Sequence, residues 1–337
     1  MNVTFKICTI GCGSLASRVH GPSYRKYAQD YSDTMLAACC DLDAKKAQAF
    51  QEKFGFHKHY TDFKEMLRAE QPDAVCLVVP EPLTAAMSVQ VMELGFPLMM
   101  EKPPGLSREE AISMIDASDR YSVPHQVALN RWHVPIALEA KVLIRSQVAK
   151  EDIHFIRYDF SRLHRVEHDF ETTAIHGISG AAFWADSPYR YVRFHYQELP
   201  HLGDKVSNIF MHCEFESGAV AHINFTPVSG ISIERATVQA LGHTFFMELP
   251  IWSAYDHPGR LVHVHGGEVK LDRSGEEISG SEELFITNGF YAENESFFND
   301  IRGGRKPQCD TRAALQFVEL ADCIRLRKTE YVRGDYQ

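Results

Sequence analysis

Two opposite charges, Glu101 and Lys102, stand between the apolar run PLMM and the prolines Pro103 and Pro104. Proline has no backbone N–H, so these two residues prevent further strand pairing at this point. In an open α/β sheet, ligands bind in the crevice outside the carboxyl ends of the strands. If PLMM is a strand of such a sheet, the charged pair lies where a ligand binds.

A second candidate lies near the N-terminus, where GCGSLA has the form G-x-G-x-x-A. The first glycine permits a tight turn, the second lets the backbone approach a pyrophosphate, and the alanine allows close helix packing. The helix N-terminus would hold the negative phosphates. The motif alone is weak, but it directly follows the apolar run FKICTI. We expect a dinucleotide to contact Gly11, Cys12, Gly13, Ser14, Leu15 and Ala16.

Asp41 ends a second apolar run, MLAACC. A carboxylate at this place can accept hydrogen bonds from both ribose hydroxyls of NAD and repel the additional phosphate of NADP. Alternatively, Asp41 only caps a helix expected at residues 43–54, a task that Asp43 could also perform. Lys45 and Lys46 lie close enough in sequence to help bind a phosphate. NAD is therefore the expected cofactor, and NADP stays open.

The first 130 residues alternate apolar runs with helical segments. We expect strands at 5–10, 35–40, 57–60, 74–79, 97–100 and 125–130. Helices are expected after the glycine loop, where Gly21 and Pro22 interrupt the pattern, at 43–54, 62–69 and 83–94, and after the capping-box pair Ser107 and Glu110. Continuous apolar strands suit a parallel sheet that is buried on both faces. The alternation predicts a doubly wound α/β domain.

Length and charge narrow the class of protein. A chain of 337 residues favours two domains. The net charge of -10, without a Lys/Arg block, argues against a nucleic-acid or anionic-membrane partner. The N-terminus has no long apolar segment typical of a signal peptide, and the longest apolar run, 74–79, is too short to span a bilayer. We therefore expect a cytoplasmic protein.

Neither cysteine nor histidine spacing predicts a metal site. The eight cysteines include no Cys-x-x-Cys pair and are interpreted as reduced core thiols. His57 with His59, and His263 with His265, alternate as on strands but lack the further ligands of a closed site.

Several segments together resemble the Gfo/Idh/MocA oxidoreductases, the family of glucose-fructose oxidoreductase and inositol dehydrogenase. They are GCGSLA, VVPEPLTAA, VMELGFP, MMEKPPG, LNRW and the C-terminal stretch from NGFYAENESFF to ELADCI. The resemblance implies an N-terminal Rossmann domain at 1–129. It also implies a C-terminal α/β domain at 130–337 with a large, mostly antiparallel open sheet, for substrate binding and for assembly into a homodimer or homotetramer. The strand-rich text at 189–266 is consistent with that sheet.

This family oxidises or reduces a secondary alcohol of a sugar or cyclitol with NAD or NADP. Hydride transfer needs a base for the hydroxyl proton and a cation near the oxygen. The resemblance makes Lys102 the first candidate for catalysis, and Glu101 would orient it or line the nicotinamide pocket. It also places Pro80 and Asn130 at the cofactor.

One departure from the family pattern concerns the expected helix of the second domain. The family usually carries Asp four residues before a catalytic His, whereas this chain has Thr172 before His176. Residues four apart share a helix face, so both can meet one ligand. Threonine cannot supply the charge that would fix the tautomer of His176. Asp169 could replace it if the helix begins early enough.

Three functions remain open at this point. The leading one is an NAD(P)-dependent dehydrogenase for a carbohydrate or cyclitol hydroxyl. The second is a lyase, epimerase or glycosidase-type enzyme that oxidises its substrate transiently with tightly bound NAD. The third is a non-catalytic NAD or sugar sensor.

Two further features of the second domain each have two interpretations. The basic cluster at 157–168 either favours an anionic substrate or is a solvated face. Trp132 either stacks on a sugar or packs at the domain junction.

Overall fold

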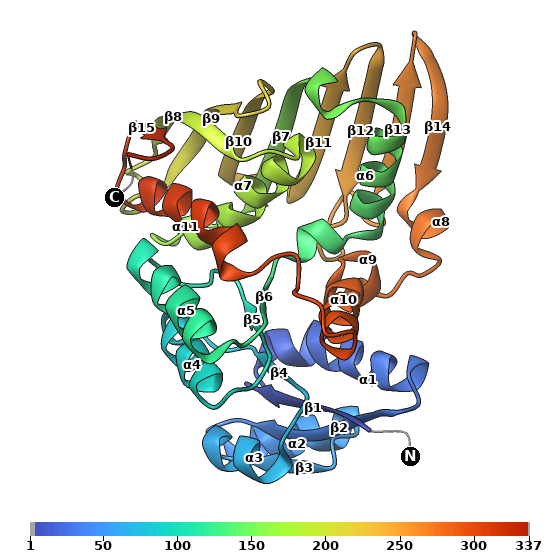
Figure 1. Cartoon of the computed structure of the whole chain (residues 1–337). Helices are drawn as coiled ribbons and strands as arrows, with labels where there is room; N and C mark the ends of the chain where they lie inside the picture. Colours follow the sequence, from blue (N-terminus) through green and yellow to red (C-terminus); the bar gives the residue numbers. More distant parts are fainter. Residues whose placement is uncertain (1–3, 336–337) are drawn as a thin grey trace. The chain divides into compact units, whose positions relative to one another are not determined.

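Six parallel strands form the sheet of the first unit in the computed structural model, which describes residues 4–335 (Figure 1). The order is β3 (Lys58–Tyr60), β2 (Thr34–Cys40), β1 (Phe5–Ile10), β4 (Ala74–Leu77), β5 (Leu98–Glu101) and β6 (His125–Ala128). All four residues of β4, β5 and β6 are buried. Continuous burial is what apolar runs predict for strands covered on both faces. The doubly wound parallel sheet is confirmed.

Four helices connect the strands from β2 to β6. They are α2 (Ala44–Phe54), α3 (Phe63–Glu70), α4 (Glu81–Glu93) and α5 (Arg108–Tyr121). The side chains of Asp43, Asp62 and Ser107 accept hydrogen bonds from the first turns of α2, α3 and α5. Helix α4 begins two residues earlier than expected, because Pro82 fits its first turn, where an N–H is not needed.

The helix after the glycine loop contains a wide turn. Residues Ala16–His20 form the π-helical segment η1, which continues into α1 (Gly21–Asp30). The N–H of Gly21 bonds to the carbonyl oxygen of Ala16, five residues back. The expected interruption at Gly21 and Pro22 is therefore a π turn within a continuing helix.

The chain divides into two compact units, with one boundary between Leu129 and Asn130. The first unit also contains Phe290–Val318, which the sequence assigned to the second domain. The physical reason lies in α10 (Phe290–Arg302), because Phe297 and Phe298 are buried in the same hydrophobic core as Tyr24. Helix α11 (Thr311–Arg325) begins in the first unit and ends in the second.

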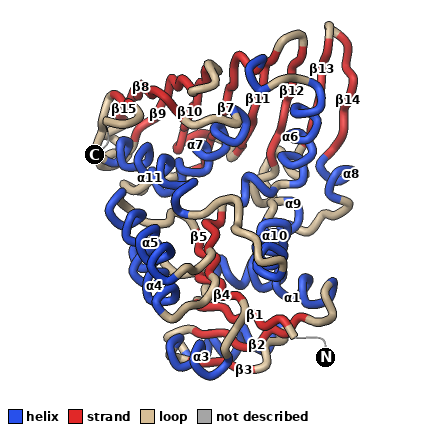
Figure 2. Tube along the Cα trace, viewed as in Figure 1, coloured by secondary structure: helices blue, strands red, loops and turns tan. Residues whose placement is uncertain are grey.

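The second unit is built on a nine-stranded, mostly antiparallel sheet (Figure 2). Among the described strands of this sheet, only β7 and β10 pair in parallel. The order is β14 (Glu268–Ser274), β13 (Arg260–His265), β12 (His243–Leu249), β11 (Ile233–Ala240), β7 (Ile153–Leu163), β10 (Val220–Ser229), β9 (Ser207–Phe215), β8 (Tyr189–Glu198) and β15 (Glu330–Val332). This sheet confirms the expected architecture of the second unit.

Two long helices pack on this sheet. Helix α6 (Pro135–Gln147) contacts β12, and α7 (Glu171–Ala185) contacts β7 and β10. Gly177 and Gly180 let α7 approach closely, because a Cβ on either would lie 2.7 Å from the ring of Phe225 or Tyr158. The remaining helical segments are η2 (Asn130–His133), η3 (Lys150–Asp152), α8 (Gly275–Ser279) and α9 (Leu284–Thr287). No helix of the described residues is long and apolar enough to cross a membrane.

Candidate functional site

The glycine loop leaves β1 in a conformation that only glycine tolerates well. Gly11 has a φ of 97°, and its N–H donates to the carbonyl oxygen of Cys40 over 2.8 Å. A Cβ at this position would lie 1.9 Å from the carbonyl oxygen of Val78. A Cβ on Gly13 would meet no atom within 4 Å. The turn is therefore tight at Gly11 and open at Gly13, where the motif requires room for a pyrophosphate.

Asp41 is bonded to this loop. Its Oδ2 accepts from the N–H of Cys12 over 2.9 Å, and its Oδ1 accepts from the N–H of Asp43 over 3.0 Å. The cap of α2 is Asp43, so the alternative role of Asp41 as the cap of that helix is wrong. A half-buried carboxylate retains lone pairs for two further donors. The loop and Asp41 together fit the pyrophosphate and ribose of a dinucleotide.

The remaining loop residues lie where the helix begins. Ala16 is fully buried and packs in the hydrophobic core, Leu15 is partly buried against that core, and Ser14 is exposed. Pro80 precedes α4 as its N-terminal flanking residue. Pro80 comes shortly after the last residue of β4, and Gly11 directly follows the last residue of β1. Both residues therefore lie at the carboxyl edge of the parallel sheet.

Glu101 ends β5, and Lys102 follows it at the same edge. Glu101 is only 7% exposed, and its Oε1 lies 2.7 Å from Nε2 of His20. Its Oε2 accepts from the N–H of Lys102 over 3.2 Å. Lys102 itself is half-buried. The carboxyl ends of β1, β2 and β5 thus bring the glycine loop, Asp41 and Lys102 to one edge.

His20 and Asn294 are site residues that the sequence did not predict. His20 is fully buried on η1, and Asn294 of α10 approaches its other ring nitrogen, with Nδ2 at 3.3 Å from Nδ1. A signal for His20 existed, because it stands four residues after Ala16 in the helix that follows the glycine loop. Asn294 had none, since it lies 274 residues further along the chain.

One cavity of the first unit lies at the other end of the strands. It has a volume of about 570 Å³, and its lining includes Pro97, Val123 and His125, which stand before β5 or at the start of β6. The expected nucleotide edge follows the last residues of the strands instead. This cavity is therefore separate from the edge that carries Asp41 and Lys102.

His176 lies on α7 of the second unit and is half-buried. The hydroxyl of Thr172 donates to the carbonyl oxygen of Asp169 over 3.0 Å. Helix α7 begins at Glu171, so Asp169 lies outside it, and its side chain is exposed. The structure does not meet the condition under which Asp169 would replace the missing carboxylate.

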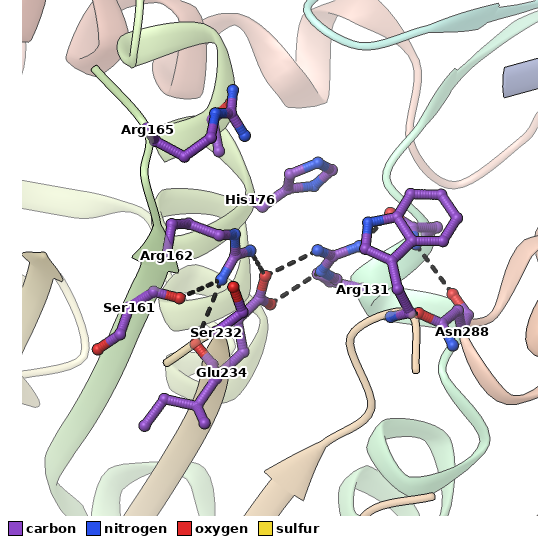
Figure 3. A network of polar contacts seen from close by, with 12 residues as sticks. Arg131, Ser161, Arg162, Arg165, His176, Ser232, Glu234 and Asn288 are labelled. Atoms are coloured by element: carbon purple, nitrogen blue, oxygen red, sulfur yellow. Dashed lines mark hydrogen bonds and ion pairs between the residues drawn. The ribbon is translucent and has the colours of Figure 1, made fainter. Parts of the chain in front are cut away.

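A buried network of charges is drawn with His176 in Figure 3. Glu234 is fully buried and receives two hydrogen bonds from Arg131, Nε to Oε2 at 2.8 Å and an NH2 group to Oε1 at 2.7 Å. Arg162 donates to the same Oε1, and the hydroxyl of Tyr158 lies 3.2 Å from Oε2. Burial alone would raise the pKa of Glu234, but Arg131 and Arg162 outweigh it and hold the pKa below its usual value.

The arginines of the basic cluster at 157–168 lie in different environments. Arg162 is buried and paired, whereas Arg157 is exposed and pairs with Asp159 at 2.8 Å. Arg165, also drawn in Figure 3, pairs with Glu167. The cluster is therefore neither a uniformly solvated face nor one continuous patch for an anion.

Trp132 and Asn130 are held inside the second unit. The indole N–H of Trp132 donates to the carbonyl oxygen of Ser179 over 3.0 Å, and its ring centroid lies 5.6 Å from that of Phe183. These contacts favour the packed interpretation of Trp132. The amide of Asn130 donates to the carbonyl oxygen of Asn288 and accepts from Arg131. Its expected cofactor contact stays a prediction.

Residues 4–335 contain no group of three or more potential metal ligands. His263 instead pairs with His243, with 2.9 Å between Nε2 and Nδ1. All eight cysteines are buried as free thiols. Cys12 contributes its backbone N–H to Asp41, while its thiol lies 3.6 Å from the carbonyl oxygen of Cys40.

Comparisons with known proteins agree with this geometry. Residues 5–129 match the Gfo/Idh/MocA family, described as an oxidoreductase family with an NAD-binding Rossmann fold. A D-glucoside 3-dehydrogenase of Escherichia coli (strain K12) is 31% identical over 131 residues, which cover 37% of this chain and 36% of that protein. The match thus spans little more than a third of the length of this curated relative.

Solved structures resemble the whole chain. An NAD-binding oxidoreductase from Klebsiella pneumoniae is 19% identical with a TM-score of 0.81, covering 98% of this chain and 99% of its own. Levoglucosan dehydrogenase, solved in complex with NADH, is 16% identical with the same TM-score and the same coverage. Identities this low show a shared fold. The family match covers the part of the chain that carries the glycine loop, Asp41 and Lys102, so residues 5–129 are similar to the Gfo/Idh/MocA oxidoreductases.

Proposed function

We propose that the chain is an NAD-dependent dehydrogenase that oxidises a secondary hydroxyl of a sugar, sugar derivative or cyclitol. The observation that carries this proposal is the shared sheet edge of the glycine loop, Asp41 and Lys102. The name of the related D-glucoside 3-dehydrogenase supports a carbohydrate-like substrate. Assembly into a homodimer or homotetramer and a cytoplasmic location stay predictions.

The proposed chemistry divides between the two units. Bound nicotinamide would supply a hydride acceptor for the carbon that bears the hydroxyl. The ammonium of Lys102 would stabilise negative charge on the substrate oxygen as that charge develops. His176 would accept the hydroxyl proton as a general base. Thr172 would contribute a neutral hydrogen bond to the substrate, because it cannot carry charge.

Asp41 is proposed to select NAD. We expect Asp41→Asn to lower kcat/KM with NAD by about 10- to 100-fold, because a charge-assisted hydrogen bond to the ribose is lost. The loss with NADP should be smaller, since the repulsion of the additional phosphate disappears. Initial rates with both coenzymes give the ratio directly.

Asp43→Asn is the matched control. It removes one negative charge two residues away, and asparagine caps helices as well as aspartate does. The control should leave the NAD to NADP ratio within about twofold of the wild-type ratio. Equal ratios in the wild type and in Asp41→Asn would contradict the assignment of Asp41.

A second function is favoured by the helix position that Thr172 occupies. This residue is a threonine where the family usually has aspartate, and its hydroxyl bonds to the backbone of Asp169. An enzyme that returns the hydride after elimination or epimerisation would use the same edge with tightly held NAD. It would turn over without added oxidant, and its NAD would copurify with the chain.

The proposed function is tested by a substrate panel. Purified protein with NAD is mixed with sugars, sugar acids and inositols, and formation of NADH is followed by absorbance. We expect at least one class to give sustained NADH formation. Turnover of a panel member without net NADH would favour the second function instead.

A further inference from the structure

His20 lies between two polar side chains of the first unit. Its Nε2 is 2.7 Å from Oε1 of Glu101 on β5, and its Nδ1 is 3.3 Å from Nδ2 of Asn294 on α10. His20 has no exposed surface. Three segments far apart in sequence thus meet at one imidazole, which contacts the residue that precedes Lys102.

The orientation of the Asn294 amide follows from its second contact. Its Nδ2 lies 2.7 Å from the carbonyl oxygen of Phe290, which can only accept a hydrogen bond. Turning the amide over would place Oδ1 against that carbonyl, two acceptors facing each other. The NH₂ group therefore faces both Phe290 and His20.

This orientation sets the protonation of His20. An amide NH₂ only donates, so Nδ1 of the ring must accept and carries no proton. In the neutral imidazole the proton is then on Nε2, which donates it to Oε1 of Glu101. The other oxygen of Glu101 accepts from the N–H of Lys102. Both carboxylate oxygens are thus fixed by donors on either side.

We propose that His20 is a positioning residue, which Asn294 holds as the Nε2–H tautomer so that Glu101 fixes the backbone from which Lys102 extends. The proposal rests on the proposed catalytic role of Lys102. The helix that carries His20 begins in the glycine loop, so the same helix would meet the cofactor phosphates and orient the catalytic strand end. Because His20 acts through Glu101 on Lys102, which would meet the substrate oxygen, it would affect kcat more than coenzyme affinity.

A pair of variants separates the two ring nitrogens. The amide nitrogen of glutamine reaches the place of Nε2, whereas that of asparagine reaches only the place of Nδ1. We expect His20→Asn to lower kcat by about 10- to 100-fold, because Glu101 loses its donor. Its KM for NAD should change less than about threefold. His20→Gln should recover most of the lost kcat.

His125→Asn controls for the removal of a buried imidazole. His125 is 4% exposed, and its ring nitrogens bond to Ser118 and Thr311, at the amino end of β6. This variant should lower the thermal midpoint while kcat stays within about twofold. Equal kcat in His20→Asn and His20→Gln, or a loss confined to the KM for NAD, would overturn the positioning role.

The tautomer can also be measured in the wild-type protein. Ring-nitrogen NMR of the histidine-labelled chain, with His20 assigned by the signals absent in His20→Gln, should show a proton on Nε2 and none on Nδ1 at neutral pH. A proton on Nδ1 would overturn the proposal whatever the kcat values of the variants. Lys102→Met with undiminished kcat would instead refute the proposed function and leave the tautomer intact.

Discussion

Replacing Lys102 with methionine should lower kcat by about 10²- to 10³-fold once a substrate from the panel is turned over. Methionine keeps the length and apolar stem of the side chain but removes the ammonium, so charge on the substrate oxygen loses its nearby cation. NAD binding should change little, because the glycine loop and Asp41 hold the phosphates and ribose. Steady-state rates and calorimetric titration with NAD measure the two effects separately.

Lys306→Met is the matched control for this change. Lys306 is exposed and lines the cavity at the amino ends of β5 and β6. Its replacement should leave kcat within about twofold of the wild-type value. A Lys102→Met protein that binds NAD and retains full kcat would show that the charged strand end takes no part in the chemistry.

Replacing Glu234 with leucine should lower the free energy of unfolding by about 3–5 kcal/mol. The change leaves the guanidinium groups of Arg131 and Arg162 buried without their anion, which costs far more than the loss of an exposed pair. Chemical denaturation with urea measures the difference. Glu268→Leu removes an exposed carboxylate that pairs with Lys270, and it should cost less than about 1 kcal/mol.

The same carboxylate predicts a pH dependence. The arginines hold the pKa of Glu234 below its usual value despite burial. The stabilisation is therefore complete above the pKa of glutamate in the unfolded chain, about 4.3, and is lost as the pH falls through the lower pKa of the folded state. Glu234→Gln should flatten this acid limb of the stability curve. An acid limb that is unchanged in Glu234→Gln would show that the pKa of Glu234 does not contribute to the pH dependence of stability.

Local sequence patterns predicted the first unit well, because its candidate site residues directly follow the strands in the sequence. The apolar runs are buried strands, the glycine motif follows β1, and the carboxyl ends of parallel strands share one edge. Asp41 and Lys102 could therefore be assigned to that edge from sequence position alone. The capping of α2 by Asp43 instead of Asp41 is decided by hydrogen bonds that two neighbouring aspartates leave open in sequence.

Long-range contacts could not be predicted in the same way. Asn294 reaches His20 only because α10 packs its phenylalanines into the core of the first unit, although its sequence lies beyond the second sheet. In the sequence, Glu234 is one acidic residue within the strand-rich text at 189–266. Nothing in the residues beside it in the sequence indicates the partners Arg131 and Arg162. These pairs depend on which strands and helices lie side by side, which sequence periodicity does not specify.

The catalytic base proposed in the second unit rests on a single position that matches the family pattern. His176 lies on a helix, as the family pattern requires, but Thr172 uses its hydroxyl to bond the backbone of the preceding turn. Asp169 lies before that helix. The position four residues before the proposed base thus holds a neutral threonine instead of the family's aspartate, which is a physical reason to test for turnover without net oxidation.

The most direct test is the absorbance of NADH after the purified chain and NAD are mixed with polyols of the carbohydrate and cyclitol classes. The account predicts sustained NADH formation with at least one class in the wild type. It also predicts a drop of about 10²- to 10³-fold in Lys102→Met under the same conditions. Saturating NAD binding with neither NADH formation nor turnover of any polyol would contradict it.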